Sequence, residues 1–176
     1  SQAVDATELI VTDDSFGAAT PQMEQTRQRL QQQVLPLLER GVVPVITGFI
    51  AATEAGVITT LGRGGSDFSA ALIGAALAAD AVWIWTDVDG ILTADPNIVP
   101  HARTLAELSY AEAVDLAYYG ADVLHPKTIR PVIDHGIPLR IVNSFNPANP
   151  GTRIVESPSR GRELLPAIIS TTGLSL

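Results

Sequence analysis

The glycine-rich segment TLGRGGSD, residues 60–67, holds the side chains best suited to chemistry in this sequence. Its three glycines allow positive φ angles and let backbone N–H groups come close to a ligand. Arg63 adds a planar guanidinium that can bind a carboxylate or a phosphate through two parallel hydrogen bonds. Ser66 is a favourable N-cap for a following helix, whose first N–H groups and dipole attract anions. We therefore predict an anion-binding loop at the start of a helix.

Asp67, at the end of this segment, could orient Arg63, hold a substrate amine, or simply lie favourably in the first helical turn. The alternative for the whole segment is a glycine-rich turn before a capped helix, with no ligand.

Two familiar phosphate loops do not fit. A Walker A loop needs Gly-Lys-Ser/Thr, but the one lysine is Lys127, and the GxGxxG fingerprint is broken because position 67 is Asp.

A second group of carboxylates follows the apolar segment 81–86, where Asp87 and Asp89 begin a polar turn. Open α/β sheets bind ligands at the carboxyl ends of their strands, so this position suits a binding site. For Asp89 alone, and for Asp95, a tight turn is the simpler interpretation. Asp87, Asp89 and Asp95 superficially suggest a calcium-binding EF-hand, but the sequence disfavours it because the twelfth position is Ile98 instead of Glu.

Composition excludes several other classes of function. The 176 residues contain no cysteine, and the three histidines have no metal-ligand spacing, so we expect no metal site on the protein. No serine stands in a GxSxG elbow. The net charge of −8 argues against nucleic acid as a partner. No apolar stretch is long enough for a membrane span, and no secretory signal is visible.

The elements that must position these loops alternate between strands and helices. We predict strands at 9–12, 41–50, 81–86 and 138–143, and a hairpin-like turn at 54–56. Helical patterns cover 66–80, 109–119 and 126–135, and an earlier one after Pro21 should be kinked or split by Pro36. This alternation predicts an α/β domain with a largely parallel sheet.

Residues 1–145 are expected to belong to one domain. From 146 to 163 the composition shifts to Pro, Gly, Ser and Arg, which is typical of a linker. The apolar run that follows predicts a strand of a further domain over 164–176. The chain begins with Ser1 rather than Met, which fits either an engineered start or an internal fragment of a longer protein.

An ordered series of motifs resembles the aspartate kinases of the amino-acid kinase superfamily. The segments TLGRGGSD, TDVDGILTADP and VLHPKT are together specific for that family. The full series is ITGFI (46–50), TTLGRGGSD (59–67), WTDVDGILTADPNIVP (85–100), ELSYAEAVDLAYYGADVLHPKTI (107–129), IPLRI (137–141) and GTRIV (151–155).

The resemblance implies part of a three-layer α/β/α sandwich with a mainly parallel sheet. It also implies transfer of the γ-phosphoryl group of MgATP to the β-carboxylate of L-aspartate, giving 4-phospho-L-aspartate, the step that leads towards lysine, threonine and methionine. ATP with Mg²⁺ would enter as a substrate. The whole protein would be a cytoplasmic homo-oligomer, with neither nucleic acid nor membrane as a partner, and 164–176 would open its regulatory ACT-domain region.

The family's functional residues transfer to two groups of positions. Arg63, Gly64, Ser66 and Asp67 would bind the aspartate substrate, and Asp67 would also be catalytic. The nucleotide would be bound by the segment after the strand at 81–86, namely Thr86, Asp87, Leu92, Thr93, Asp95, Pro96 and Asn97.

This sequence departs from the family pattern at Leu92, Asn97 and Asp122, where an aromatic residue, an Arg and a Lys are common. Two positive charges that would face the nucleotide are therefore replaced. The family's N-terminal KFGG segment, which positions the transferred phosphate, has no counterpart before Ile10, so we expect the 176 residues alone to be inactive as a kinase. The alternatives are a non-catalytic binding or regulatory module with this fold, and a kinase of another amino acid.

Overall fold

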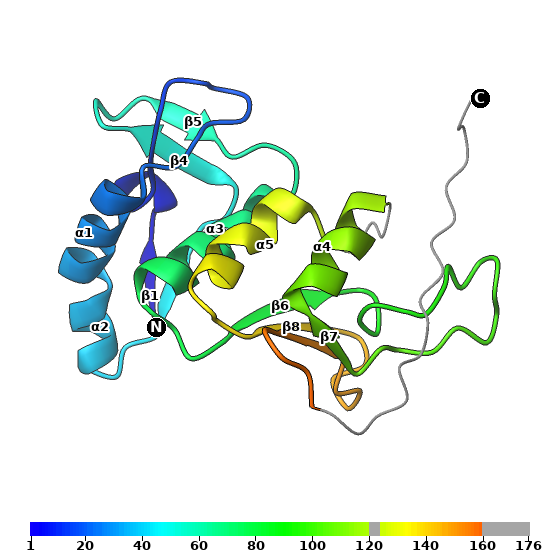
Figure 1. The fold of residues 1–176 in the computed structure, drawn as a ribbon. Coiled ribbons are helices and arrows are strands. Elements are labelled where there is room, and N and C mark those ends of the chain that lie inside the picture. Colours follow the sequence, from blue (N-terminus) through cyan, green and yellow to red (C-terminus); the bar gives the residue numbers. More distant parts are fainter. Residues whose placement is uncertain (120–123, 160–176) are drawn as a thin grey trace, which may run out of the picture. The chain divides into compact units, whose positions relative to one another are not determined.

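The computed structural model describes residues 1–119 and 124–159 (Figure 1). The chain divides into two compact units. Unit 1 comprises residues 1–79 and 127–135, and unit 2 comprises the rest. Both units combine strands with helices, and among the described strands four of the six pairings are parallel. The expected α/β class with a mainly parallel pairing pattern is therefore confirmed.

Unit 1 has two small sheets and the helices that cover them. Strand β1 pairs with β3 in parallel, and β4 pairs in parallel with β2 and antiparallel with β5. The elements are β1 (Gln2–Val4), the 3₁₀ helix η1 (Ala6–Glu8), β2 (Val11–Thr12), α1 (Met23–Gln33), α2 (Leu35–Glu39), β3 (Pro44–Ile46), β4 (Ile50–Thr53), β5 (Ile58–Thr60), α3 (Gly65–Ala76) and α5 (Pro126–Asp134).

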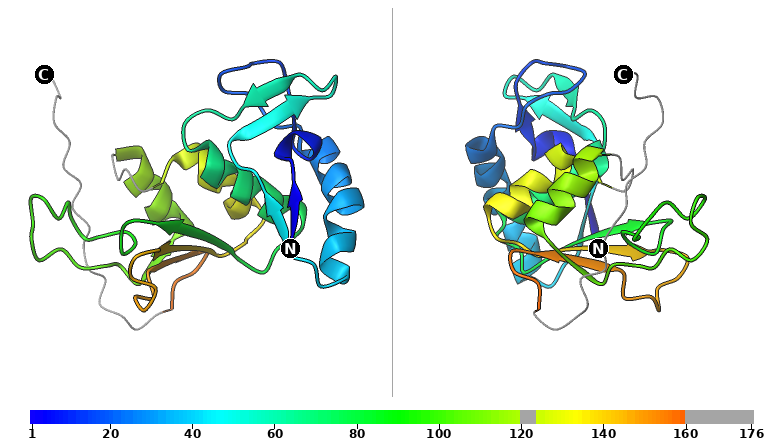
Figure 2. Two further views of the ribbon diagram at one scale, coloured as in Figure 1. Left: turned by 180° about the vertical axis from the view of Figure 1, so that it is seen from behind. Right: turned by 45° about the vertical axis from the view of Figure 1, so that its right-hand side comes forward.

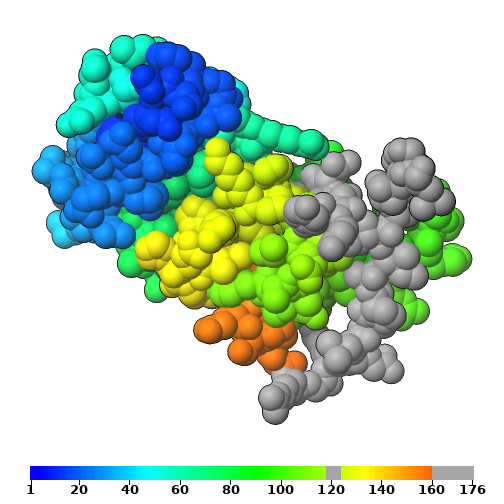
Figure 3. Space-filling model, turned by 45° about the horizontal axis from the view of Figure 1, so that its top comes forward, coloured from blue at the N-terminus to red at the C-terminus, as the bar shows by residue number. Residues whose placement is uncertain are grey.

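The core of unit 1 lies where η1, α1 and α3 meet β4. Leu9, Ile10, Leu30 and Leu72 are at most 1% exposed and belong to one apolar cluster. Helix α1 is rich in glutamine and fully buries Thr26 and Leu30, one helical turn apart. Met23, at the start of the helix, packs partly buried against the same cluster, and the exposed side of the helix belongs to the blue surface of the space-filling view (Figure 3).

Unit 2 is built on one four-stranded sheet in the order β6-β8-β9-β7. Its elements are β6 (Val82–Thr86), β7 (Glu107–Ser109), α4 (Tyr110–Tyr119), β8 (Leu139–Asn143) and β9 (Thr152–Val155). Helix α4 follows β7 directly and lies along one face of this sheet (Figures 1 and 2). Ile84, Ile141 and Ile154 are buried on three neighbouring strands.

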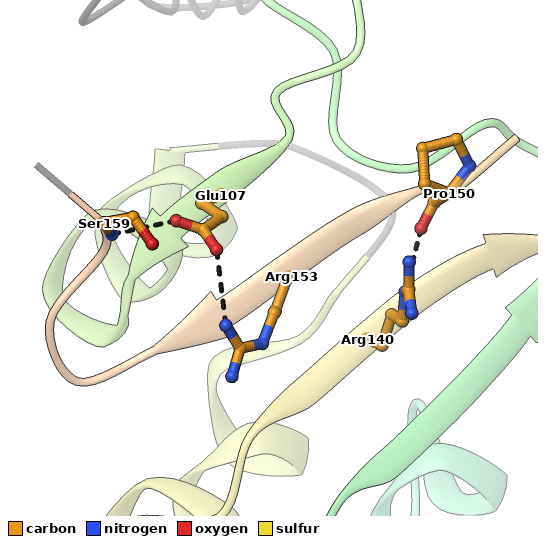
Figure 4. A network of polar contacts seen from close by, with 5 residues as sticks. All are labelled: Glu107, Arg140, Pro150, Arg153 and Ser159. Carbon is orange, nitrogen blue, oxygen red and sulfur yellow. Dashed lines mark hydrogen bonds and ion pairs between the residues drawn. The ribbon is translucent and has the colours of Figure 1, made fainter. Parts of the chain in front are cut away.

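Among the described residues, the other face of the sheet carries the exposed side chains of Trp83, Trp85 and Arg153. A row of paired residues crosses it, with Trp83 beside Arg140, Arg140 beside Arg153, and Arg153 beside Glu107. The Arg140 guanidinium lies 4.9 Å from the Trp83 ring centre, and its Nε donates to the Pro150 carbonyl at 2.9 Å. Arg153 forms an ion pair with Glu107 at 3.3 Å (Figure 4).

The predicted elements agree with the structure in most cases. The helical segment after Pro21 is split, as expected: α1 ends at Gln33 and α2 begins at Leu35, with Pro36 in its first turn, where the missing proline N–H costs no helical hydrogen bond. The single strand predicted over 41–50 is wrong. Two strands, β3 and β4, occupy that region, and the chain turns between them at Phe49, whose φ is +74°. The predicted helix 66–80 ends earlier, at Ala76.

The region predicted as a linker, 146–163, contains strand β9. Thr152 and Ile154 are buried in the sheet between β8 and β7, so an irregular linker is wrong for residues 152–155. Prolines and glycine on either side of the strand gave the segment its linker-like composition. The division into domains stays a prediction, and its last part, 164–176, lies outside the described residues. Within the residues that the structure describes, no helix is long and apolar enough to cross a membrane.

The turn before β9 should be the most sensitive glycine position in unit 2. Gly151 has a φ of +68°, and a Cβ there would overlap the Ile141 carbonyl oxygen of β8. We expect Gly151→Ala to lower the free energy of unfolding by more than about 3 kcal/mol, measured by urea denaturation. Gly136→Ala is the matched control, because Gly136 also has a positive φ of +64° but open space around it. It should cost only about 1 kcal/mol, and equal effects at both positions would contradict the steric explanation.

Candidate functional site

The glycine-rich loop 60–67 joins β5 to α3 in unit 1, as the sequence predicts. Gly62 and Gly64 have φ angles of +79° and +66°, which glycine adopts without strain. A Cβ at Gly62 would lie 3.2 Å from the Cβ of Ala18, so the loop packs tightly against the segment after β2. Arg63, between the two glycines, is exposed. The backbone thus presents the guanidinium on the outside of a tightly packed loop.

Glycine is also required where the helix begins. A Cβ at Gly65 would lie 2.6 Å from a ring carbon of Phe49, so the aromatic ring lies against the first residue of α3. A Cβ at Gly48 would come within 3.2 Å of Ser66. The corner formed by Gly48 and Phe49 therefore packs directly against the loop that carries the predicted substrate-binding residues.

Ser66 is not the N-cap of this helix, which corrects the sequence prediction. Gly64 is the N-cap in the left-handed conformation, and the first helical hydrogen bond runs from the Phe68 N–H to the Gly64 carbonyl at 2.9 Å. The chain enters the helix earlier than expected because Gly64 accepts a positive φ. Ser66 lies exposed in the first turn. The first N–H groups of a helix have no acceptor within the helix, so this end still attracts an anion.

Asp67 lies in the same turn and is half-buried. Burial raises the pKa of its carboxyl above the ordinary value, since removal from water disfavours the charged form. The next residue, Phe68, is buried, and the Lys127 ammonium lies 5.3 Å from its ring centre. A partly desolvated carboxylate beside an exposed arginine and a helix N-terminus can hold or orient a charged small molecule.

The predicted nucleotide-binding residues lie in unit 2, in the loop that follows β6. Thr86 ends the strand, and its hydroxyl donates to the Asp87 carboxylate at 3.2 Å. Leu92 forms an isolated bridge with Thr104, and the Thr93 N–H donates to the Arg103 carbonyl at 2.9 Å. These contacts fold the loop back on itself.

Further along the same loop, Asp95 forms a local turn with Asn97. Its carboxylate accepts hydrogen bonds from the backbone N–H of Asn97 at 2.8 Å and from its side-chain amide at 3.0 Å. Asp95, Pro96 and Asn97 are all exposed. The turn expected at Asp95-Pro96 is therefore present, and it ties Asn97 into a local hydrogen-bonded structure.

Asp89 does more than form the simple turn predicted for it, because its side chain connects two loops. Its carboxylate accepts from the side-chain amide of Asn143 at 2.7 Å and from that of Asn146 at 3.2 Å. It thereby ties the loop after β6 to the loop after β8. Sequence reasoning missed both asparagines, although Asn143 is the last residue of a predicted strand, as Thr86 is of another.

Thr152 is another residue that the sequence did not single out. Its buried hydroxyl accepts a hydrogen bond from the Ile91 N–H at 2.8 Å, so β9 holds the start of the same loop. Gly90 is needed at this contact, because a Cβ there would lie 2.6 Å from the Thr152 hydroxyl oxygen.

Asp122, one of the departures from the family pattern, lies outside the described residues. Over residues 1–119 and 124–159, no three His, Cys, Asp or Glu side chains are grouped so that they could hold a metal ion.

The structure thus brings the predicted residues together in two groups. Arg63, Gly64, Ser66 and Asp67 share one loop and helical turn of unit 1, and the nucleotide residues share one loop of unit 2. Which ligands they bind, and whether Asp67 is catalytic, stay predictions.

Comparison with known proteins identifies relatives over most of the chain. Residues 1–143 match the amino acid kinase family. Aspartokinase 2 of Arabidopsis thaliana, a chloroplastic protein, is 47% identical over 74% of this chain and 24% of its own length. The lysine-sensitive aspartokinase 3 of Escherichia coli is 42% identical over 88% of this chain and 34% of its own. The chain therefore spans about a quarter to a third of these relatives.

Among solved structures, E. coli aspartokinase III in complex with aspartate and ADP, in the R-state, has a similar fold. The TM-score is 0.85 at 41% sequence identity, and the match covers 90% of this chain and 35% of that one. The resemblance to aspartate kinases, first suggested by the motifs, is confirmed by these matches.

The raised pKa of Asp67 predicts how its replacement affects stability. Asp67 is protonated more readily in the folded state, so ionising it at neutral pH opposes folding. We expect Asp67→Asn to increase the free energy of unfolding at pH 7. The gain should shrink as the pH falls, and vanish below the ordinary pKa of an aspartate, where the carboxyl is protonated in both states. Denaturation curves at several pH values measure this, with Asp14→Asn, at an exposed position in the same unit, as control. A gain that is independent of pH would contradict the desolvation argument.

Proposed function

This chain belongs to the amino acid kinase family, and from that premise we propose that it serves in an aspartate kinase. The reaction would transfer the γ-phosphoryl group of ATP to the β-carboxylate of L-aspartate. The observation that carries the proposal is the loop 60–67, where an exposed arginine and a half-buried aspartate flank the open N-terminus of α3. The similar E. coli structure is a complex with aspartate and ADP, which supports both substrates.

In this proposal the loop of unit 1 binds the amino acid. The Arg63 guanidinium would pair with a carboxylate of aspartate through two parallel hydrogen bonds. Ser66 and the backbone of Gly64 would complete the contacts. Asp67 would bind the substrate amine or orient the reacting groups. Its partial desolvation supports this role. A carboxylate that has lost part of its hydration is stabilised strongly when a cationic group binds beside it.

The loop after β6 in unit 2 would bind the nucleotide. Thr86 and Asp87 would contact the adenosine part, and residues 92–97 would form the rest of the wall. We propose that Mg²⁺ arrives with ATP, as MgATP, and neutralises phosphate charge during transfer. The position of the loop at the carboxyl end of β6 supports this assignment.

Further properties follow from the same proposal. One relative is named as lysine-sensitive, which supports inhibition by an end-product amino acid in the whole protein. We propose a homo-oligomer without nucleic acid or membrane partners. A cytoplasmic location is part of the same proposal, whereas the Arabidopsis relative is named as chloroplastic.

Binding of L-aspartate to the chain tests the unit 1 assignment by isothermal titration calorimetry. We expect Arg63→Ala to weaken binding about a hundredfold, since a charge-paired group is lost. Arg63→Lys should weaken it about tenfold, because lysine keeps the charge but not the planar fork.

Arg27→Ala and Arg27→Lys are the matched controls, because Arg27 pairs with Glu24 on the outside of α1. They should leave the affinity unchanged. Tighter binding of L-glutamate than of L-aspartate would favour a kinase of another amino acid. Unchanged aspartate binding in Arg63→Ala would remove the assignment.

The nucleotide assignment predicts that a missing charge can be restored. Asn97→Arg should increase the affinity for ATP about fivefold at low salt, and the gain should shrink as ionic strength rises. The backbone hydrogen bond from residue 97 to Asp95 is kept in this variant. Gln32→Arg adds the same charge on the exposed side of α1 and should have no effect. Equal gains at both positions would show that net charge, and not the site, is responsible.

A further inference from the structure

Phe49 has an unusual backbone conformation for a residue with a side chain. Its φ of +74° lies in the left-handed region, which a bulky residue rarely adopts. Its side chain is also 42% exposed, so burial of the ring does not by itself explain the conformation. Strained residues of this kind persist only where their surroundings hold them.

Ser69, one turn into α3, holds this conformation. The backbone N–H of Phe49 donates to the Ser69 hydroxyl oxygen at 3.0 Å, and this hydroxyl donates to the Gly65 carbonyl at 2.9 Å. Ser69 is only 2% exposed, so its bond to the Gly65 carbonyl is buried and its bond to the Phe49 N–H is partly buried. The hydroxyl therefore connects the strained residue to the first turn of the helix.

The other contacts of Phe49 reach the glycine-rich loop. Its carbonyl accepts the Leu61 N–H at 3.0 Å, and its ring lies against Gly65. If Phe49 relaxed to a negative φ, its N–H, its carbonyl and its ring could not keep these three contacts together. Leu61 and Gly65 flank the segment that contains Arg63, so such a change would move the guanidinium relative to the helix end.

We propose that Ser69 is a positioning residue for the acceptor site. It holds Phe49 in the left-handed conformation, and Phe49 in turn fixes both ends of the segment 61–65 for an amino-dicarboxylate ligand. This inference rests on the function proposed above. A merely structural role for Ser69 would be the bond to the Gly65 carbonyl alone, a common arrangement for serine within helices.

A double-mutant cycle separates the two roles, because glycine adopts a φ of +74° without strain. We expect Ser69→Ala to weaken L-aspartate binding about tenfold when residue 49 is Phe, and less than about twofold when it is Gly. The same factor in both backgrounds, or no effect in either, would overturn the proposal.

Hydrogen exchange provides a readout that needs no ligand. Ser69→Ala should accelerate exchange of the Leu61 amide, which is bonded to the Phe49 carbonyl, and the Phe49→Gly background should suppress this acceleration. If the original chain fails to bind aspartate, the proposed function fails, while the exchange data still decide how Ser69 acts.

Thr26→Ala is the matched control for loss of a buried hydroxyl in unit 1. The Thr26 hydroxyl accepts the Val11 N–H at 3.0 Å, away from the glycine-rich loop. This variant should lower the melting temperature while leaving aspartate affinity within about twofold. A drop in affinity equal to that of Ser69→Ala would show that lost stability alone explains the effect, and would count against the proposal.

Discussion

At the start of helix α3, the backbone of Gly65 and the ring of Phe49 approach so closely that no side chain fits between them. Gly65 has the Phe49 ring at 2.6 Å from where its Cβ would be, and Gly62 and Gly48 have neighbours at 3.2 Å. Most of the chemistry assigned to unit 1 depends on this approach. It brings an arginine, a serine and an aspartate into one loop and one turn, beside helical N–H groups that lack internal acceptors. The left-handed Phe49 costs on the order of 1 kcal/mol or more, which the surrounding contacts must offset.

Sequence patterns predicted the elements well where a single local preference decides. Pro36 splits a helix, Trp83 and Trp85 alternate with buried residues along β6, and the glycine-rich loop lies between a strand and a helix. The errors arose where distant contacts decide. The break at Phe49 depends on Ser69, twenty residues away, and β9 depends on pairing with β7 and β8. A linker-like composition could not reveal that Thr152 and Ile154 are buried.

For the candidate site, the residues with distinctive chemistry were identifiable from their types and spacing. The residues that hold them in place were not. Asn143, Thr152 and Ser69 are ordinary polar residues in the sequence, and only their partners, Asp89, Ile91 and Phe49, show what they do. Ser66 was assigned as a helix cap on residue preference, but the left-handed Gly64 takes that position. Supporting contacts between residues far apart in the sequence are therefore the part of a site that requires coordinates.

The exposed tryptophans on the unit 2 sheet have a practical consequence. Trp83 and Trp85 are the two tryptophans of the sequence, and both lie on β6 with ring centres 6.2 Å apart. Intrinsic tryptophan emission therefore originates in unit 2 alone, whereas unit 1 contributes none. Arg140, 4.9 Å above one ring, makes that emission sensitive to the β6–β8 pairing. Fluorescence can thus follow the unfolding of unit 2 without a label, whereas the helical circular dichroism signal reports both units together.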